Sequence, residues 1–453
     1  MQDLTTGSVT RHLLKTTGFM LVTMVFQTLY FLADLYWVGR LGKEAVAAVG
    51  VAGNLTFIVL AATQMLAVGT TTLVSHAAGR KDKDQATLVF NQSIVLGAAS
   101  GLTFFVLGML VRRWYAESIA ADARTAELAL QFLSWFIPAM ALQFPIVSMS
   151  AALRGTGNFK PGMIVQTATV IINIIVTPFL VFGWMGLPAL GVRGAAIASF
   201  VALAIGTSWL AFYFRGPSAY LHIRPAQWTP RFAMWSAMLK VGLPAGAEFA
   251  LMAVYLFVLY IVIRPFGAAA QAAVGIGLRV VQASFLPVVA LGIAVAPVAG
   301  QNVGAKLASR VRQTFRSGAV MASGLMSLAM LICLVAPAQL MSAFSDDAQV
   351  LAIGTEYLRI VAFNFVPSGI VFVASSMFQA MGNTIPPLIT SFARSLSVGI
   401  ALVLIAQVEG FQLAWIWYIG VAVTWMQMTA NLLLLRREYA RRLAFEPAPG
   451  AEA

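Results

Sequence analysis

The sequence predicts an all-α integral membrane protein with twelve transmembrane helices arranged as two parallel repeats of six. Hydrophobic residues make up 60% of its 453 residues and charged residues only 10%, whereas a soluble domain carries about 25% charged residues. Apolar runs of membrane-spanning length recur along the whole chain, and the second half matches the first without a gap over about 140 residues at an offset of 225. We therefore expect a lipid bilayer to cover most of the apolar surface.

The apolar runs define the individual helices. A helix needs about 20 mainly apolar residues to cross the hydrocarbon core, and twelve segments meet this length. The expected spans are 14–39, 46–76, 87–111, 127–152, 162–184, 192–215, 236–263, 271–300, 313–338, 350–379, 387–408 and 412–435.

The charge pattern predicts the topology. Most of the 29 Lys and Arg residues lie in segments that share one side of the membrane when both termini are cytoplasmic. We therefore expect a multi-pass protein of the plasma (bacterial inner) membrane. The basic residues flank apolar runs and are not interleaved with exposed aromatic residues, so the net charge of +13 does not indicate nucleic-acid binding.

The repeat predicts the domain organisation. Gly157, Asn158 and Pro161 superpose on Gly382, Asn383 and Pro386 when the sequence is shifted by 225. Each repeat contains an even number of helices, so both enter the membrane in the same sense and are related by an axis along the membrane normal. The predicted parts are an N-terminal lobe (1–214), a cytoplasmic linker (215–235), a C-terminal lobe (236–436) and a cytoplasmic tail (437–453), with a central cavity between the lobes.

Four stretches resemble the multidrug and toxic compound extrusion (MATE) transporters, with the prokaryotic DinF-type branch as the nearest fit. They are DLYWVGRLGKEAVAAVG, GRKDKDQA, RGTGNFKPG and LGVRGAAIAS, and the resemblance spans nearly the whole chain. It implies a secondary antiporter that exports organic, often cationic, compounds by alternating access in exchange for H⁺ or Na⁺. We expect amphipathic organic cations as substrates, no cofactor, and a functional monomer.

Asp34 is the main candidate for coupling transport to an ion. It follows eighteen uncharged residues and precedes Arg40 by six, which places it about 9 Å along the helix from that end. An acid at a helix centre costs about 2.5–3.5 kcal/mol to insert, and intramembrane acids are by default functional. The alternative is a carboxylate satisfied by neighbouring donors and kept for packing. The residues Thr16, Thr23, Gln27, Tyr30 and Asp34 share one helix face.

A second polar stripe lies on the helix expected at 162–184. It comprises Gln166, Thr169, Asn173 and Thr177, and the alternative interpretation is hydrogen bonding between helices alone. The resemblance implies that a proton or Na⁺ at the position of Asp34 competes with the substrate. We expect Tyr30, Asn173, Thr177 and Ser199 to form the polar shell of Asp34.

The coupling ion is expected to be H⁺ rather than Na⁺. The DinF-type pattern on this helix resembles Asn-x-x-x-Asp-Pro, whereas this chain reads NIIVTP, so Thr177 replaces an aspartate. Loss of a negative charge weakens a Na⁺ site more than a protonation site. The repeat partner of Asp34 is Leu259, which confines the chemistry to the N-terminal lobe.

Further side chains are candidates for binding the substrate. Methionine and aromatic side chains can repack around varied shapes. Glu248 and Arg394 lie at similar depths in their helices, so an ion pair between them is the alternative to a substrate-binding Glu248. The substrate-binding candidates are Gln27, Phe31, Gln166, Glu248, Met252 and Tyr255.

Other functional classes find little support in the sequence. The single cysteine, Cys333, and three scattered histidines give no metal-binding spacing, and no P-loop or HExxH motif is present. An enzyme or receptor is therefore disfavoured. A lipid-linked precursor flippase remains an alternative, although only Arg279 and Arg394 could bind its phosphates, and so does an exporter of one dedicated metabolite.

Overall fold

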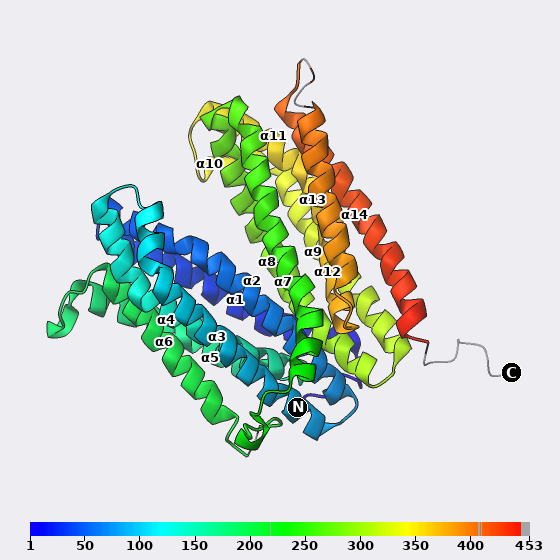
Figure 1. Ribbon diagram of the computed structural model, residues 1–453. Coiled ribbons are helices and arrows are strands. Elements are labelled where there is room, and N and C mark those ends of the chain that lie inside the picture. Colours follow the sequence, from blue (N-terminus) through cyan, green and yellow to red (C-terminus); the bar gives the residue numbers. More distant parts are fainter. Residues whose placement is uncertain (218, 406–407, 409, 445–453) are drawn as a thin grey trace. The chain divides into compact units, whose positions relative to one another are not determined.

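The computed structural model describes residues 1–217, 219–405, 408 and 410–444, and its regular secondary structure there is helical throughout (Figure 1). Among these residues, twelve helical segments are long and apolar enough to cross a membrane, which confirms the predicted number. The helices are α1 (Val9–Gly39), α2 (Lys43–Gly79), α3 (Lys83–Ile119), α4 (Ala123–Gly155), α5 (Phe159–Phe182), α6 (Val192–Tyr213), α7 (Phe232–Ile263), α8 (Ala268–Gly304), α9 (Ala308–Val335), α10 (Pro337–Ser342), α11 (Ala348–Val361), α12 (Phe365–Ala380), α13 (Ile385–Ile405) and α14 (Leu413–Arg442).

The tenth span, in the second repeat, differs from the fourth span, its equivalent in the first repeat. In the first repeat the equivalent helix, α4, runs without a break although it contains Pro138 and Pro145. In the second repeat the short 3₁₀ turn Ala362–Asn364 separates α11 from α12, and together they make the single span Ala348–Ala380. The equivalent span is therefore one continuous helix in the first repeat and an interrupted helix in the second.

The chain forms two compact units, which we call the N-lobe and the C-lobe. The N-lobe comprises Met1–Asp3 and Gly18–Leu243, and the C-lobe comprises Leu4–Thr17 and the chain from Pro244 onward. These boundaries differ from the predicted lobes 1–214 and 236–436, because the first part of α1 packs in the C-lobe and the first part of α7 packs in the N-lobe. The two exchange points lie within one residue of equivalent positions in the repeat.

Hydrogen bonds and buried side chains explain the exchange at α1. The backbone N–H of Leu4 donates to Oε1 of Gln301 at 3.0 Å, and Nδ2 of Asn302 donates to the Leu4 carbonyl at 3.2 Å. Val9 and Leu13 are fully buried in the C-lobe core. The start of α1 is therefore fixed to the C-lobe, whereas the rest of α1 belongs to the N-lobe.

The predicted linker is bound to α3 of the N-lobe by hydrogen bonds, and we call its bonded part, residues 222–231, the strap. Two consecutive buried amides, Asn91 and Gln92, hold it. Asn91 Nδ2 donates to the His222 carbonyl at 2.9 Å, and Asn91 Oδ1 accepts from the Arg224 backbone N–H at 2.9 Å. Gln92 bonds the strap further along, and its Oε1 accepts from the backbone N–H of Arg231 at 2.9 Å. The linker therefore belongs structurally to the N-lobe.

Candidate ion-coupling site in the N-lobe

Most hydrogen bonds of the polar stripe on α1 are made to the backbone of α1 itself, and one is made to a neighbouring helix. The hydroxyl of Thr16 donates to the His12 carbonyl at 2.7 Å, and that of Thr23 donates to the Phe19 carbonyl at 3.0 Å. Gln27 is exposed. Within the described part of the chain, only Tyr30 of the stripe bonds a neighbouring helix, since its hydroxyl lies 3.0 Å from Oγ of Ser199 on α6. The part of the stripe that contacts another helix is therefore its last turn.

Three expected shell residues form one hydrogen-bonded network between α5 and α6. Nδ2 of Asn173 donates to Oγ of Ser199 at 3.1 Å, and Oγ1 of Thr177 donates to the Asn173 carbonyl at 2.7 Å. All three side chains are buried, with exposed fractions of 2%, 4% and 0% for Asn173, Ser199 and Thr177. Through Ser199 the network also binds Tyr30, so the four shell residues are brought together.

Local sequence explains why this network forms. Around Ser199, α6 carries the small buried residues Ala195, Ala196, Ala198 and Ala202, and small residues let neighbouring helices approach closely in membranes. Asn173 and Thr177 are one turn apart on α5 and therefore face α6 together. Buried amides and hydroxyls need partners, and these residues supply them to one another.

Asp34 lies one turn beyond Tyr30, and its carboxylate is not part of this network. Its side chain is half-buried, and Oδ1 is enclosed with no hydrogen-bond partner within the described residues. The shell role of Tyr30, Asn173, Thr177 and Ser199 toward Asp34 thus remains a prediction. An enclosed carboxylate oxygen without a donor is unfavourable unless a proton or cation joins it.

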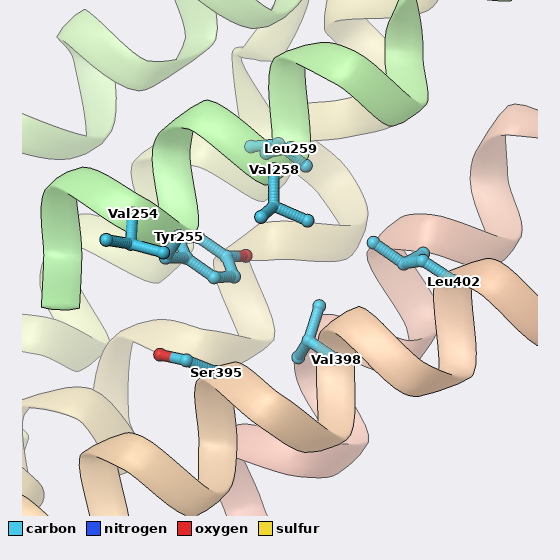
Figure 2. Close-up of a pocket in the computed structure, with 7 residues that line it drawn as sticks. All are labelled: Val254, Tyr255, Val258, Leu259, Ser395, Val398 and Leu402. Atoms are coloured by element: carbon cyan, nitrogen blue, oxygen red, sulfur yellow. The ribbon is translucent and has the colours of Figure 1, made fainter.

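The C-lobe contains a cavity at the positions equivalent to this site. Its volume is about 30 Å³, and Figure 2 shows Tyr255 and Val258 of α7 facing Val398 and Leu402 of α13. Four of its lining residues are the repeat partners of Tyr30, Asp34, Asn173 and Thr177, namely Tyr255, Leu259, Val398 and Leu402. The tyrosine is retained, and the other three polar groups are replaced by aliphatic side chains.

Glu248 and Arg394, for which an ion pair was the alternative to substrate binding by Glu248, form no ion pair in the described residues. No nitrogen–oxygen distance between them is within 4.0 Å; the Ser391 hydroxyl instead donates to Oε1 of Glu248 at 2.9 Å. Nη1 of Arg394 donates to Oε1 of Gln427 at 3.4 Å, and its guanidinium lies 5.0 Å from the centre of the Tyr255 ring. The two charged residues lie at similar depths in their helices, but the hydrogen-bonded side chains of Ser391 and Gln427 lie between them.

The remaining substrate-binding candidates belong to both lobes. Phe31 and Met252 are exposed, with fractions of 60% and 54%. Nε2 of Gln166 donates to Oγ of Ser150 on α4 at 3.3 Å, so this amide joins helices within the N-lobe. Their role in binding a substrate remains a prediction.

Sequence reasoning missed Ser391 and Gln427, which contact the charged residues of the C-lobe. A signal for Gln427 was present, because Thr424, Gln427 and Asn431 share one face of an otherwise apolar helix at steps of three and four. Ser391 precedes Arg394 by three residues and so lies on the same face of α13.

Comparison with known proteins identifies the family. The MatE family model matches residues 20–179 and again 244–405. The chain belongs to the MatE family. The two matched ranges begin at nearly equivalent positions in the repeat, and the second begins where the C-lobe portion of α7 begins.

Two curated relatives of this MatE chain have names that refer to multidrug resistance. The probable multidrug resistance protein YoeA of Bacillus subtilis is 25% identical over 381 residues, covering 82% of this chain and 81% of YoeA. The probable multidrug resistance protein NorM of Thermotoga maritima is 23% identical over 410 residues, covering 90% and 86%. A solved MOP superfamily transporter from Pyrococcus furiosus has the same fold, with a TM-score of 0.88, 22% identity and coverage of 97% and 98%.

Proposed function

We propose that this MatE-family membrane protein is a secondary active antiporter that exports small organic compounds, with Asp34 as the residue that couples export to an ion. The observation that carries the proposal is the enclosed, unpartnered Oδ1 of Asp34, one helical turn from the Tyr30–Ser199–Asn173–Thr177 network. The names of the relatives YoeA and NorM favour a multidrug substrate range, and the DinF-type branch remains the nearest fit from the sequence motifs.

We favour H⁺ over Na⁺ as the coupling ion. Sodium needs several oxygen ligands, and the shell oxygens already take part in hydrogen bonds among themselves. Thr177 occupies the place of a second carboxylate. A proton needs only the Asp34 carboxylate, so its binding does not require the network to rearrange.

In the proposed cycle, Asp34 carries a proton from outside to the cytoplasm and exchanges it there for a cationic substrate. Protonation removes the negative charge that attracts the cation, so the two ligands exclude each other. One charge crossing the membrane potential contributes about 2.3 kcal/mol per 100 mV. One or two protons therefore supply enough energy for uphill export.

Reconstituted liposomes test the proposal. They would be loaded with a fluorescent organic cation and given either a pH gradient or a Na⁺ gradient, with wild type and Asp34→Asn compared. We expect export driven by the pH gradient alone and abolished in Asp34→Asn, with unchanged insertion. Export of equal rate in the variant contradicts the role of Asp34, and export driven only by Na⁺ contradicts the choice of ion.

The alternative functions are distinguished by the same preparation. A lipid-linked precursor flippase would move an anionic lipid and ignore organic cations, and an exporter of one metabolite would move a single compound among those tried. We place both termini in the cytoplasm and the protein in the plasma membrane as a monomer. A cysteine-accessibility assay on residues added at each terminus tests that topology.

A further inference from the structure

The C-lobe contains a charged cluster that the proposed coupling at Asp34 does not use. It joins α7, α13 and α14 through a chain of hydrogen bonds in which each side chain donates to the next. Arg394 donates to Gln427 at 3.4 Å, Gln427 Nε2 donates to Oγ of Ser391 at 3.2 Å, and Ser391 donates to Glu248 at 2.9 Å. The chain therefore begins at a cation and ends at an anion, with two neutral side chains between.

Both charges lie within the lobe rather than toward lipid. Arg394 falls on the stripe of α13 that includes Thr390, Val398 and Leu402, whose exposed fractions are 7%, 3% and 1%. Its guanidinium lies over the ring of Tyr255 on α7. A guanidinium has five N–H donors, and within the described residues Arg394 uses one of them, at a long distance. Its capacity to bind an anionic group is therefore largely unused.

One further polar group beside the cluster is enclosed without a hydrogen bond in the described part of the chain. Asn431, fully buried one turn after Gln427, accepts from Thr390 through Oδ1 at 3.0 Å, but its Nδ2 has no partner. Ser375 of α12, 5% exposed, lies beside the Glu248 carboxylate and adds a hydroxyl to that end of the cluster. Buried polar groups are normally hydrogen-bonded, so Nδ2 of Asn431 is a donor available to a ligand.

The charges are specific to this lobe. The repeat partners of Glu248, Ser391, Arg394 and Gln427 in the N-lobe are Thr23, Gln166, Thr169 and Ala202, none of which is charged. The shared helical scaffold thus does not need an acid and an arginine at these positions. Intramembrane charges without a structural requirement indicate function.

We propose that this cluster binds the zwitterionic members of the substrate range, with the anionic group on Arg394 and the cationic group on Glu248. The inference rests on the proposed transport of organic compounds. A substrate with only a negative charge would be repelled by Glu248, and one with only a positive charge would be repelled by Arg394. A zwitterion satisfies both residues, and a planar guanidinium binds a carboxylate through two parallel hydrogen bonds.

Rhodamine 110 and its methyl ester, rhodamine 123, make a matched pair of probes. They share the cationic ring system, but only rhodamine 110 has a free carboxylate. Affinity for protein in lipid nanodiscs would be measured by fluorescence anisotropy without any ion gradient. We expect Arg394→Gln to weaken binding of rhodamine 110 about tenfold or more, the effect of one charged hydrogen-bonded contact. Binding of rhodamine 123 is expected to stay equal or become tighter.

Control variants separate the site from general effects of charge and folding. Arg279→Gln removes an exposed arginine of α8 in the same lobe and is expected to change neither affinity. Arg394→Lys keeps the charge but loses the two-donor geometry, so an intermediate affinity for rhodamine 110 is expected even if the glutamine variant misfolds on gel filtration.

Failure of this proposal and failure of the proposed function give different results. Asp34→Asn is expected to keep rhodamine 110 binding while losing gradient-driven export, because the two sites belong to different lobes. Equal loss of both probes in Arg394→Gln, unchanged affinity for rhodamine 110, or no binding of rhodamine 110 by the wild type would overturn the assignment of the cluster. None of these results depends on ion coupling.

Discussion

The Asp34 site of the N-lobe and the cavity of the C-lobe occupy equivalent places in two copies of one scaffold. In the N-lobe, Tyr30 bonds a network of Ser199, Asn173 and Thr177 beside an acid. In the C-lobe, the tyrosine remains as Tyr255, and aliphatic residues leave a cavity of about 30 Å³. The shared fold therefore does not require polar groups at the positions of Asp34, Asn173 and Thr177.

The features that both lobes share are structural. Gly157 and Gly382 have positive φ angles of 76° and 73° at the turns after α4 and α12, a conformation that glycine adopts without a steric penalty. Asp122 and Asp347 accept backbone N–H bonds at the starts of α4 and α11. This turn and this helix cap are therefore retained in both lobes, whereas the cap of α3, Asp82, is replaced by Leu307 before α9.

The largest effect is expected from giving the N-lobe the residue that the C-lobe has. Asp34→Leu should reduce ion-driven export to the background of empty liposomes, because no group then exchanges a proton for the substrate. Expression and gel filtration should remain normal, since Leu259 occupies the equivalent position. Leu259→Ala is the matched control and should export at the wild-type rate. Ion-driven export by Asp34→Leu would mean that the lobes do not differ in coupling.

A smaller effect is expected from removing the hydroxyl that both lobes retain. Tyr30→Phe loses the bond to Ser199, and a net loss of about 0.5–1.5 kcal/mol corresponds to a reduction in export of about two- to tenfold. Tyr255→Phe should reduce the pH-driven rate less than Tyr30→Phe does, because no coupling acid follows it. Equal reductions in the two variants would assign the tyrosines a purely structural role.

The cavity gives a prediction for stability alone. Val398→Ile adds one methylene to its wall, and burial of one methylene contributes about 0.8 kcal/mol. We expect the midpoint of thermal unfolding to rise slightly with no change in export. Asn173→Ile, at the equivalent position, should lower it, because Ser199 then loses a donor. A fall in the midpoint for Val398→Ile would mean that the cavity wall cannot accept the methylene.

The smallest effect concerns the shared helix caps. Hydrogen bonds from Thr125, first from its backbone N–H, hold the pKa of Asp122 below its ordinary value of 3.8. The stabilisation is therefore present above the unfolded-state pKa and is lost as the pH falls through the lower folded-state value. Asp122→Ala should lower the unfolding midpoint slightly at neutral pH, and the difference from wild type should shrink in strong acid. A difference independent of pH would exclude the cap as its cause.

The sequence was sufficient for the membrane spans, the repeat and the shared helix face of Asn173 and Thr177, because each depends on local patterns. Apolar length defines a span, and helical spacing places Asn173 and Thr177 on one face. It was not sufficient for the exchange of helix starts at Thr17 and Leu243, which depends on packing against distant residues. Asn91 and Gln92 carried no periodic signal that would identify their partners in the strap.

The ion pair considered for Glu248 and Arg394 is absent from the described residues for a physical reason. Counting residues gives the height of a side chain along its helix but not the direction in which neighbouring helices present their own side chains. Ser391 bonds Glu248 and Gln427 bonds Arg394, so the two charges do not meet. Similar positions along the helices therefore suggested an ion pair that the packing of the helices does not allow.

The central claim is that Asp34 alone exchanges a proton for a cationic substrate, and proton release on binding tests it most directly. Tetraphenylphosphonium, a cation with no titratable group, would be added to purified protein in weak buffer containing a pH-sensitive dye. The account predicts release of about one proton per bound cation from the wild type, by linkage, and none from Asp34→Asn. Equal proton release from both proteins would contradict it.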